Sequence, residues 1–538
     1  MTPRLIRLHG ESVAAIDPRI WAAMERLVPV KFLTSEASPD SETVDAFIFL
    51  GREGNLSKIN SCGAKRCMVI ASSLSDFPEE VRGGEIRFGN FPSLDYRLRG
   101  RTLSHDPVKK ISSFTLEEGD IVYAEYGLRP VWIRRRSAVA VVEFLTVPLP
   151  SLKNGEFPFD YLNGSHFIQL LPLVHFLRDV VGVLDWQPQP LRACLMFDDP
   201  NLHWTSYGFL PFRETAALAE ETNFHVACAT VPLDGWFVHS PTANIFRCNS
   251  RRLSLLMHGN DHIREELGVP RDVDSDRMLV SQALHRVARL EGRAKIRVAR
   301  VMAPPHGASR PQILRAMFDL GLEGACISPW SLRHWGAGRN WPASFGLEVA
   351  ELMDGPFPVA PRFKMTAGCE GWVAISAFLN RPIVPVGHHD AVAEGIDLLR
   401  EIADTVNSLG RVDWGDMESI FRSSFLTRRQ GATIVVRPYC CRFSIAVPDG
   451  ITTIELDRRD SCDSLWQVVS GERTEVVGGS AEGNAVSVVG GLTVEFQLLG
   501  WAVVDYREVA SPSVSMWALP RSILCELRDR VRPLLATR

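Results

Sequence analysis

The chain has 538 residues, a formal net charge of −4 at pH 7, 46% hydrophobic residues and 23% charged residues. This length predicts about three or four domains, and the composition is typical of a soluble globular protein. Because the net charge is small for this size, it gives no reason to expect a nucleic acid or an acidic membrane surface as partner.

The sequence shows no targeting segment and no membrane span. No apolar core of signal-peptide length follows the arginines in residues 1–9, and the longest apolar run, residues 138–147, is interrupted by Glu143. The 11 cysteines are scattered without metal-finger spacing, which favours free thiols in a reducing compartment. We therefore expect a cytoplasmic protein, either a monomer or a homo-oligomer.

The first domain that we expect covers residues 1–190 and is an open α/β sheet, because short apolar runs alternate with polar helical stretches. Strands are predicted at 5–8, 30–33, 46–50, 67–71, 121–125, 130–134 and 138–145, and helices at 18–27 and 167–183. Together with the run at 127–132, the alternation resembles the class I glutamine-amidotransferase-like and flavodoxin-like folds. No Gly-x-Cys-x-Gly elbow surrounds Cys62 or Cys67. The domain is therefore expected to be structural or ligand-presenting, without a catalytic cysteine.

Two further domains are expected after the first. Over residues 191–430 strands alternate again with longer helices, which are predicted at 276–290 and 391–409. Residues 431–538 differ, because short strands separated by Gly, Asp and Ser turns predict a β-sandwich. A helix at 520–535 closes the chain. The fold class is therefore α/β and multidomain.

Four polar clusters each follow an apolar run that is predicted to be a strand. In chain order they are Asp198-Asp199, His258 with His262, Pro305-His306 and His388-His389. In barrels and open α/β sheets, the carboxyl ends of parallel strands share one edge, where active sites lie. The repeated position after a strand therefore predicts that the clusters converge, although they are far apart in the sequence.

Each cluster also has an ordinary explanation when it is taken alone. An Asp-Asp pair after a strand is often a helix N-cap or a turn. Two histidines four residues apart share one helical face and can be a hydrogen-bonded surface pair. The Pro-Pro-His-Gly run can be only a turn, and one ring of His388-His389 can be buried in a strand end. The order of all four together favours a functional site.

The combination of residue types has a chemical reason. Two imidazoles and one carboxylate hold a divalent ion well and leave a position open for water. A second carboxylate beside the metal can act as general base, and backbone N–H groups in a tight turn can stabilise an oxyanion. A separate imidazolium can protonate a leaving amine. The four clusters supply all of these groups.

The segments MFDDP, MHGNDH, MAPPHG and VGHHD resemble, in this order, the motifs of the polysaccharide deacetylases (carbohydrate esterase family 4, the NodB-like fold). The resemblance implies a distorted (β/α)7 barrel over residues 191–430. It also implies a divalent metal, zinc first, with cobalt, nickel or manganese as alternatives. By carry-over from the motifs, the metal ligands are Asp199, His258 and His262, the base is Asp198, the oxyanion donor is the backbone N–H of His306, and the acid is His388 or His389.

Three positions depart from the family pattern. Gly259 stands where a Ser or Thr supports the metal-binding loop, Ala303 stands where an Arg orients the base, and His306 stands where Tyr is usual. No charge partner for the base is therefore apparent in the motifs. Arg300 and Arg310 are the candidates that could replace the missing arginine.

The residues that follow the first cluster are candidates for substrate binding. Flat aromatic faces can stack on the C–H faces of sugar rings, although ordinary packing is the commoner role of such residues. We name His203, Trp204, Tyr207 and Pro305 as the substrate-binding candidates.

The function that the sequence favours is hydrolysis of the acyl group of an N-acyl or O-acyl carbohydrate, with a sugar or sugar conjugate as substrate. One alternative is a catalytically weak glycan-binding or assembly protein with the same fold. A hydrolase of a non-sugar amide is the other.

Overall fold

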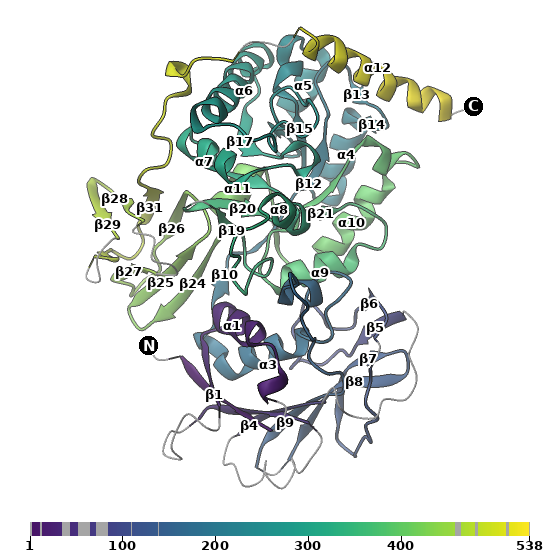
Figure 1. The fold of residues 1–538 in the computed structure, drawn as a ribbon, viewed down its shortest axis with the longest axis vertical. Coiled ribbons are helices and arrows are strands. Elements are labelled where there is room, and N and C mark those ends of the chain that lie inside the picture. The colour runs from purple at the N-terminus through teal and green to yellow at the C-terminus, as the bar shows by residue number, and fades with distance from the viewer. Residues whose placement is uncertain are drawn as a thin grey trace. The chain divides into compact units, whose positions relative to one another are not determined.

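A computed structural model describes residues 3–10, 13–34, 44–51, 65–71, 84–108, 110–137, 139–353, 355–457, 464–478, 483–512 and 516–536 (Figure 1). Cys62 lies outside these residues. The chain forms two compact units. Unit 1 contains Met1–Trp186, Asn340–Glu348 and Glu370–Leu379, and unit 2 contains Gln187–Arg339, Val349–Cys369 and Asn380–Arg538.

Unit 1 is built on a sheet of nine strands in the order β2-β1-β3-β4-β9-β8-β7-β5-β6. The pairs from β2 to β9 are parallel and the remaining pairs are antiparallel. The strands are β1 (Arg4–His9), β2 (Val30–Thr34), β3 (Ala46–Leu50), β4 (Arg66–Ile70), β5 (Gly84–Phe88), β6 (Thr102–His105), β7 (Ile121–Tyr126), β8 (Arg129–Arg136) and β9 (Val141–Leu145). The expected α/β sheet of the N-terminal region is thus present.

The described residues of unit 1 form three α-helices. They are α1 (Pro18–Leu27), α3 (Leu171–Val181) and α9 (Glu370–Phe378). Helix α1 begins where the Asp17 side chain accepts the backbone N–H of Arg19 at 2.9 Å, which is the usual N-cap arrangement. Helices α1 and α3 cover one face of the sheet in Figure 1. Their apolar residues and those of the strands form one buried core.

Unit 2 contains the second large sheet, of nine strands in the order β19-β20-β18-β17-β16-β15-β12-β22-β21. Every pair is parallel except β19 with β20. The strands are β12 (Leu195–Asp198), β15 (Val226–Thr230), β16 (Leu253–Met257), β17 (Val298–Met302), β18 (Gly324–Cys326), β19 (Glu351–Met353), β20 (Phe357–Ala360), β21 (Phe363–Lys364) and β22 (Pro385–Gly387).

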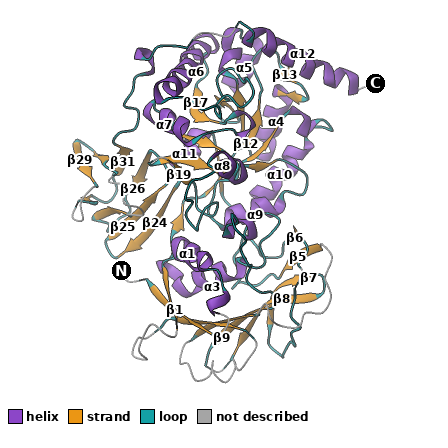
Figure 2. Cartoon of the chain, in the orientation of Figure 1, coloured by secondary structure: helices purple, strands orange, loops and turns teal. Residues whose placement is uncertain are grey.

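Helices alternate with these strands, and most lie on the outside of the sheet (Figure 2). They are α4 (Phe212–Thr222), α5 (Ser240–Cys248), α6 (Val273–Ala294), α7 (Pro311–Asp319), α8 (Pro329–Trp335), α10 (Asp397–Asn407), α11 (Met417–Arg422) and α12 (Ala518–Ala536). The helix predicted at 276–290 lies inside α6. Only residues 397–407 of the predicted helix 391–409 belong to α10. The two-stranded pairs β11 (Leu191–Ala193) with β23 (Val412–Trp414) and β13 (Ser206–Tyr207) with β14 (Leu210–Pro211) complete this part.

The sheet of unit 2 is curled. Strands β20 and β21 are separated by only Pro361 and Arg362, yet β21 forms one end of the strand order and β20 is next to the other end. Three peptide units span at most about 11 Å, so the two edges of the sheet must approach each other. Among the described residues, the link of Pro361 and Arg362 connects the two edges, and no hydrogen-bonded pair of strands joins them. The sheet is therefore an incomplete barrel, which agrees in part with the distorted (β/α)7 barrel that the resemblance implied.

The interior of the curled sheet is filled by alternate strand residues. Met196 of β12 and Leu256 of β16 belong to one buried apolar cluster with small residues of the neighbouring strands. Side chains two residues apart on a strand face the same side. Asp198 and His258 follow at that spacing, and the His258 backbone continues the ladder by donating to Thr230 O at 3.0 Å. Both polar side chains therefore face the interior at the carboxyl ends of their strands.

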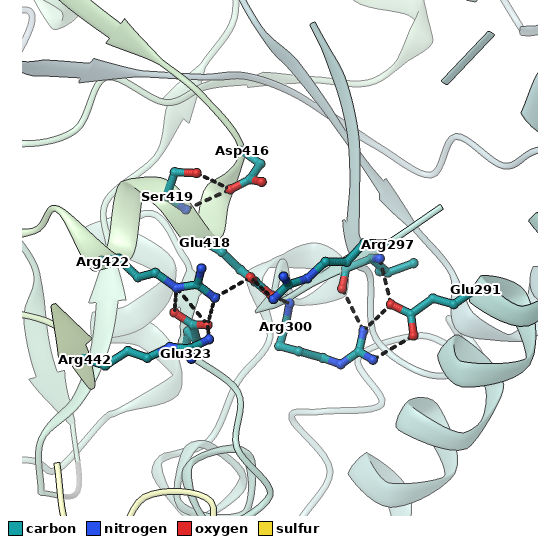
Figure 3. A network of polar contacts seen from close by, with 10 residues as sticks. Glu291, Arg297, Arg300, Glu323, Asp416, Glu418, Ser419, Arg422 and Arg442 are labelled. Carbon is teal, nitrogen blue, oxygen red and sulfur yellow. Dashed lines mark hydrogen bonds and ion pairs between the residues drawn. The ribbon is translucent and has the colours of Figure 1, made fainter. Parts of the chain in front are cut away.

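The opposite end of the strands is closed by α11 and by an ion-pair network (Figure 3). The Glu418 carboxylate accepts the backbone N–H of Arg300 at 2.7 Å and pairs with Arg422 at 2.6 Å. The buried carboxylate of Glu323 pairs with Arg422 and with Arg442, which lies on a strand of the C-terminal region. This network fixes the amino end of the sheet, far along the strands from Asp198.

The C-terminal region has two antiparallel-rich sheets, as a sandwich requires. One contains β10 (Gln187–Pro188), β24 (Phe425–Gln430), β25 (Thr433–Pro438), β27 (Thr453–Leu456) and β30 (Ala485–Ser487), and the other contains β26 (Arg442–Ala446), β28 (Trp466–Ser470), β29 (Arg473–Val477) and β31 (Thr493–Leu498). Phe425 of the first sheet contacts Phe443 of the second with ring centroids 5.0 Å apart. In the described part of the chain, no helix is both long and apolar enough to cross a membrane.

Candidate metal centre

The first and second polar clusters meet at the carboxyl edge of the curled sheet. Asp199 Oδ1 lies 3.3 Å from His258 Nε2 and 3.3 Å from His262 Nε2. The three ligand atoms lie within 4.8 Å of one another, as a shared metal ion requires. The predicted ligand set is therefore assembled in one place.

The environment of His258 fits a metal ligand. Its Nδ1 donates a hydrogen bond to the carbonyl oxygen of Ala303 at 2.8 Å, which leaves Nε2 with a free lone pair toward Asp199. Nε2 is buried and makes no hydrogen bond among the described residues. A buried polar atom without such a partner is costly, and a bound cation would remove that cost. Two nitrogen donors and one carboxylate oxygen are a set that suits zinc and similar divalent ions.

The charge balance of the group is consistent with a pre-formed site. Burial alone would raise the pKa of Asp199, but the neighbouring rings of His258 and His262 hold it well below its ordinary value. Burial lowers the pKa of His262, yet the hydrogen bond that His262 donates to Asp199 and the negative charge of Asp199 outweigh burial and raise it. The carboxylate is therefore ionised and available at neutral pH.

Three residues of the predicted site have a positive φ angle, a backbone conformation that residues other than glycine rarely adopt. The φ angles are 84° for Asp199, 52° for His262 and 56° for His306. Asp199 would otherwise point away from the interior, because it follows Asp198 on the strand. Its left-handed conformation turns the side chain toward the two histidines. Such conformations cost about 1–3 kcal/mol each and are concentrated at functional sites.

Glu266 supports the loop that carries His262. Its Oε1 accepts the backbone N–H groups of Asn260 at 2.6 Å, Asp261 at 3.1 Å and His262 at 3.0 Å. Glu266 itself is only 5% exposed. This explains the departure at Gly259, whose φ is 66°. A Cβ at Gly259 would lie 2.3 Å from Glu266 Oε1. The glycine is thus required by the carboxylate that replaces the hydroxyl of the family motif.

Gly259→Ala is expected to lower divalent-metal affinity by about 10- to 100-fold, the range typical of losing support for a ligand. The new methyl group displaces the Glu266 carboxylate from its three N–H donors, so that His262 moves. Gly338→Ala is the matched control, because Gly338 also has a positive φ, 86°, but nothing lies within 4 Å of its Cβ position. Competition with a chromogenic chelator measures the affinity. Equal affinities of the two variants would contradict this role of Gly259.

Asp198 has a charge partner that the motifs do not reveal. Arg362 Nη1 lies 3.0 Å from both carboxylate oxygens of Asp198, and both residues are buried. The arginine comes from the two-residue link between β20 and β21, where the edges of the sheet approach each other. The substitutes considered from the sequence do not reach Asp198. Arg300 pairs with Glu291 at the far end of its strand (Figure 3), and Arg310 pairs with Asp276 at 2.8 Å.

The structure separates the two adjacent histidines of the last cluster. His388 is exposed over 58% of its side chain, and its Nε2 lies 3.8 Å from Asp199 Oδ2. His389 is buried, its Nε2 lies 3.8 Å from Asp529 Oδ1 of α12, and its ring contacts Tyr207 with centroids 5.6 Å apart. Of the pair, only His388 is brought to the metal ligands.

The third cluster forms a tight turn beside His262. The turn Pro305–Gly307 is closed by the N–H of Gly307, which donates to Pro304 O at 3.0 Å. Pro305 is buried, whereas His306 is exposed and its ring lies 5.2 Å from the His262 ring between centroids. Burial and the charge of His262 lower the His306 pKa, so its ring is neutral at pH 7.

None of the four substrate-binding candidates is among the residues that line the cavity over the metal ligands. His203 is buried, and its Nδ1 contacts Glu526 of α12 at 2.6 Å while its Nε2 contacts Asp234 O at 2.8 Å. Tyr207 is 5% exposed. Trp204 is exposed and lies under the guanidinium of Arg530. The structure thus joins this loop to α12 and not to the metal ligands.

A cavity of about 1010 Å³ opens over the ligands. It is large enough for a small-molecule ligand. The residues that line it include Asp198, His258, His262, His306, Arg362 and His388. Five of the predicted catalytic or ligand residues other than Asp199 therefore line one cavity, together with Arg362, which the sequence did not predict.

No protein-family model and no curated protein matches the sequence. The solved structure described as Agd3, a novel carbohydrate deacetylase, is similar at 10% identity and a TM-score of 0.48, over 92% of this chain and 98% of that chain. A family 4 carbohydrate esterase from Streptomyces lividans in complex with acetate matches at 11% identity and a TM-score of 0.26, over 43% of this chain and 94% of its own. A CE4 esterase from Streptococcus mutans matches at 14% identity and a TM-score of 0.26, over 42% and 87%. Likenesses of this strength carry no functional argument, so the function is inferred from the geometry of the site.

Two supporting residues have no signal in the motifs. Arg362 is far from the first cluster in sequence, and only the curling of the sheet brings it to Asp198. Glu266 lies only four residues after His262. A carboxylate so close in sequence can accept backbone N–H groups of the loop, so the sequence did contain a local signal for this support.

Proposed function

We propose that the protein is a metal-dependent hydrolase that removes an acyl group, with an N-acylated or O-acylated carbohydrate as the substrate class. The observation that carries this proposal is the pairing of buried Asp198 with Arg362 beside Asp199, His258 and His262 at one cavity. A carboxylate that is positioned but is not needed as the third ligand is suited to act as a general base.

Each side chain has a separate role in the proposed reaction. Asp198 takes the proton of the attacking water, while Arg362 holds its carboxylate in place. His388, which is exposed to the cavity, gives a proton to the leaving nitrogen or oxygen. The backbone N–H of His306, in the Pro305–Gly307 turn beside the cavity, stabilises the negative charge that develops on the substrate oxygen.

Asp199, His258 and His262 would hold a divalent ion, with zinc as our first choice and cobalt, nickel or manganese as alternatives. When bound, such an ion supplies Lewis-acid polarisation of the acyl carbonyl. The aqueous cavity over these ligands gives a sugar-sized substrate access to them.

The alternative of a catalytically weak glycan-binding protein was motivated by Ala303, which stands where the family arginine is expected, and by the two additional domains. Arg362 fills that role from another strand end, at 3.0 Å from the base. This contact favours the hydrolase over the binding protein.

The first test is the metal content of the full chain by elemental analysis, compared with Asp199→Ala and His262→Ala. We expect about one divalent ion per chain in the wild type and less than a tenth of that in both variants, because three ligands are the minimum for a tight site. His239→Ala is the control, since the ring of His239 contacts Thr242 outside the site. Its metal content is expected to equal that of the wild type.

Release of acetate from acetylated amino-sugar oligomers then tests the reaction. Wild-type protein without metal after incubation with zinc, cobalt and nickel would refute the metal-dependent mechanism. Loaded protein that releases no acetate from any acetylated sugar would refute the proposed substrate class.

A further inference from the structure

Helix α12 binds the rest of unit 2 through its polar face. Ser522 donates to Asp234 Oδ1, Glu526 contacts buried His203, and Asp529 faces His389. These three α12 residues follow one another at spacings of four and three, so they share one side of the helix. A helix on the surface of a globular protein normally turns its apolar side inward. In α12 the arrangement is reversed.

The apolar face of α12 points outward. Leu524 is 66% exposed, Leu527 53%, Val531 45% and Ile523 37%. Their spacings of three and four residues place them on one continuous stripe, opposite the face that contacts the rest of unit 2. Within the described part of the chain, this stripe therefore remains open to solvent. An exposed apolar stripe of this kind marks a binding surface.

Arginines border the apolar stripe. Arg521, Arg528 and Arg532 follow one another at spacings of seven and four, so they form a row beside Leu524. The side chains of Arg528 and Arg532 are 58% and 52% exposed, although both also pair with Asp529, and Arg521 donates to the carbonyl oxygen of His262. The carboxylates of the helix, in contrast, lie on the inner face with His203 and His389. The outer surface is thus apolar with a basic edge.

This charge pattern argues against a second copy of the chain as the occupant. The 3–4 spacing of Leu524, Leu527 and Val531 is that of a coiled-coil seam, so a helix-to-helix dimer has to be considered. The positions that flank such a seam carry Arg521, Arg528 and Arg530. No carboxylate occupies a flanking position to pair with these arginines, and in an antiparallel pair arginine would face arginine across the seam, which is destabilising.

We infer that the outer face of α12 is a docking surface for membranes that contain anionic phospholipids. The helix lies along the membrane surface, with Leu524, Leu527 and Val531 among the acyl chains near the headgroups. Arg521, Arg528 and Arg532 contact the phosphate groups. An amphipathic helix with a basic edge binds in this way through buried apolar area and attraction to anionic lipid. The inference does not depend on the proposed enzymatic function.

The test is co-sedimentation of the full chain with vesicles of phosphatidylcholine alone and of phosphatidylcholine mixed equally with phosphatidylglycerol. Binding is expected only to the anionic vesicles, and it is expected to weaken as salt is raised. Leu524→Glu with Leu527→Glu is expected to weaken it by at least 10-fold, and Arg528→Ala with Arg532→Ala by about 10-fold or more. Val489→Glu, in the turn between β30 and β31, is the control, because Val489 is 64% exposed and its change should leave binding intact.

Thermal unfolding of each variant shows whether the fold is retained, since the replaced leucines lie outside the packed face. Equal binding of wild type and the leucine variant, or no binding to anionic vesicles, would overturn the inference. So would a wild-type dimer in sedimentation equilibrium that the leucine variant dissociates, because the stripe would then be covered by a second copy. Binding of an acidic protein that protects the stripe, without vesicle binding, would overturn it as well.

Discussion

Asp198→Asn is expected to lower kcat for acyl-group hydrolysis by about 10²- to 10⁴-fold while the metal content stays at the wild-type value. The amide cannot accept the proton of the attacking water, and a general base contributes a factor of this size. Asp198 does not belong to the group of three ligand atoms, so the metal site keeps its donors. The asparagine oxygen can still accept a hydrogen bond from Arg362. The measurement is kcat together with elemental analysis of the same preparation.

Asp390→Asn is the matched control for this substitution. Asp390 also lines the cavity, but it is exposed and we assign it no role in the reaction. Its variant is expected to retain kcat within about threefold, which corresponds to less than 1 kcal/mol. If Asp198→Asn and Asp390→Asn lost activity equally, the assignment of the base would be wrong. Loss of the metal from Asp198→Asn would instead make Asp198 a ligand.

Arg362→Met is expected to lower kcat by about 10²-fold, or ~2.7 kcal/mol in the activation barrier, with KM and metal content little changed. The guanidinium contacts both oxygens of buried Asp198 through one nitrogen, so its loss leaves the carboxylate without its positioning partner. Because methionine has a similar length and apolar stem, packing around Met196 and the neighbouring strands is largely kept. The KM-against-kcat comparison separates positioning of the base from substrate binding.

Arg362→Lys provides the rescue experiment. A single nitrogen makes both contacts, so an ammonium group can restore part of them, and we expect an intermediate kcat. Lys364→Met is the control, because Lys364 lines the same cavity two residues later. An Arg362→Lys variant as inactive as Arg362→Met, with both unfolding at the same lowered temperature, would show that Arg362 is only structural.

The metal-ligand group follows from local sequence signals. Asp199, His258 and His262 each come directly after, or within one short loop of, a strand that the apolar runs predict. Parallel strands bring their carboxyl ends to one edge by topology alone, so the convergence could be predicted without coordinates. The open α/β sheet of unit 1 and the β-structure after residue 430 were predicted for the same reason, since the period of the apolar residues reports which faces are buried.

The residues that complete the site depend on contacts between distant segments. Arg362 reaches Asp198 only because the sheet curls until β20 and β21 approach, and no periodicity in the sequence reports that curvature. His389 lies against α12, whose Asp529 faces its ring, so of the two adjacent histidines only His388 lines the cavity. Gly259 looks like the loss of a supporting hydroxyl until Glu266 is seen in the space that a side chain would occupy.

The sequence by itself therefore determined the elements, the order of the clusters and the three metal-ligand candidates, because these depend on spacing and burial along single segments. Only the tertiary structure decided the partner of Asp198, the histidine that faces the cavity and the outward apolar face of α12. Each of these depends on how far apart segments are placed in space. Side-chain pairing between such segments is set by packing and charge in three dimensions, and it leaves no fixed spacing in the chain.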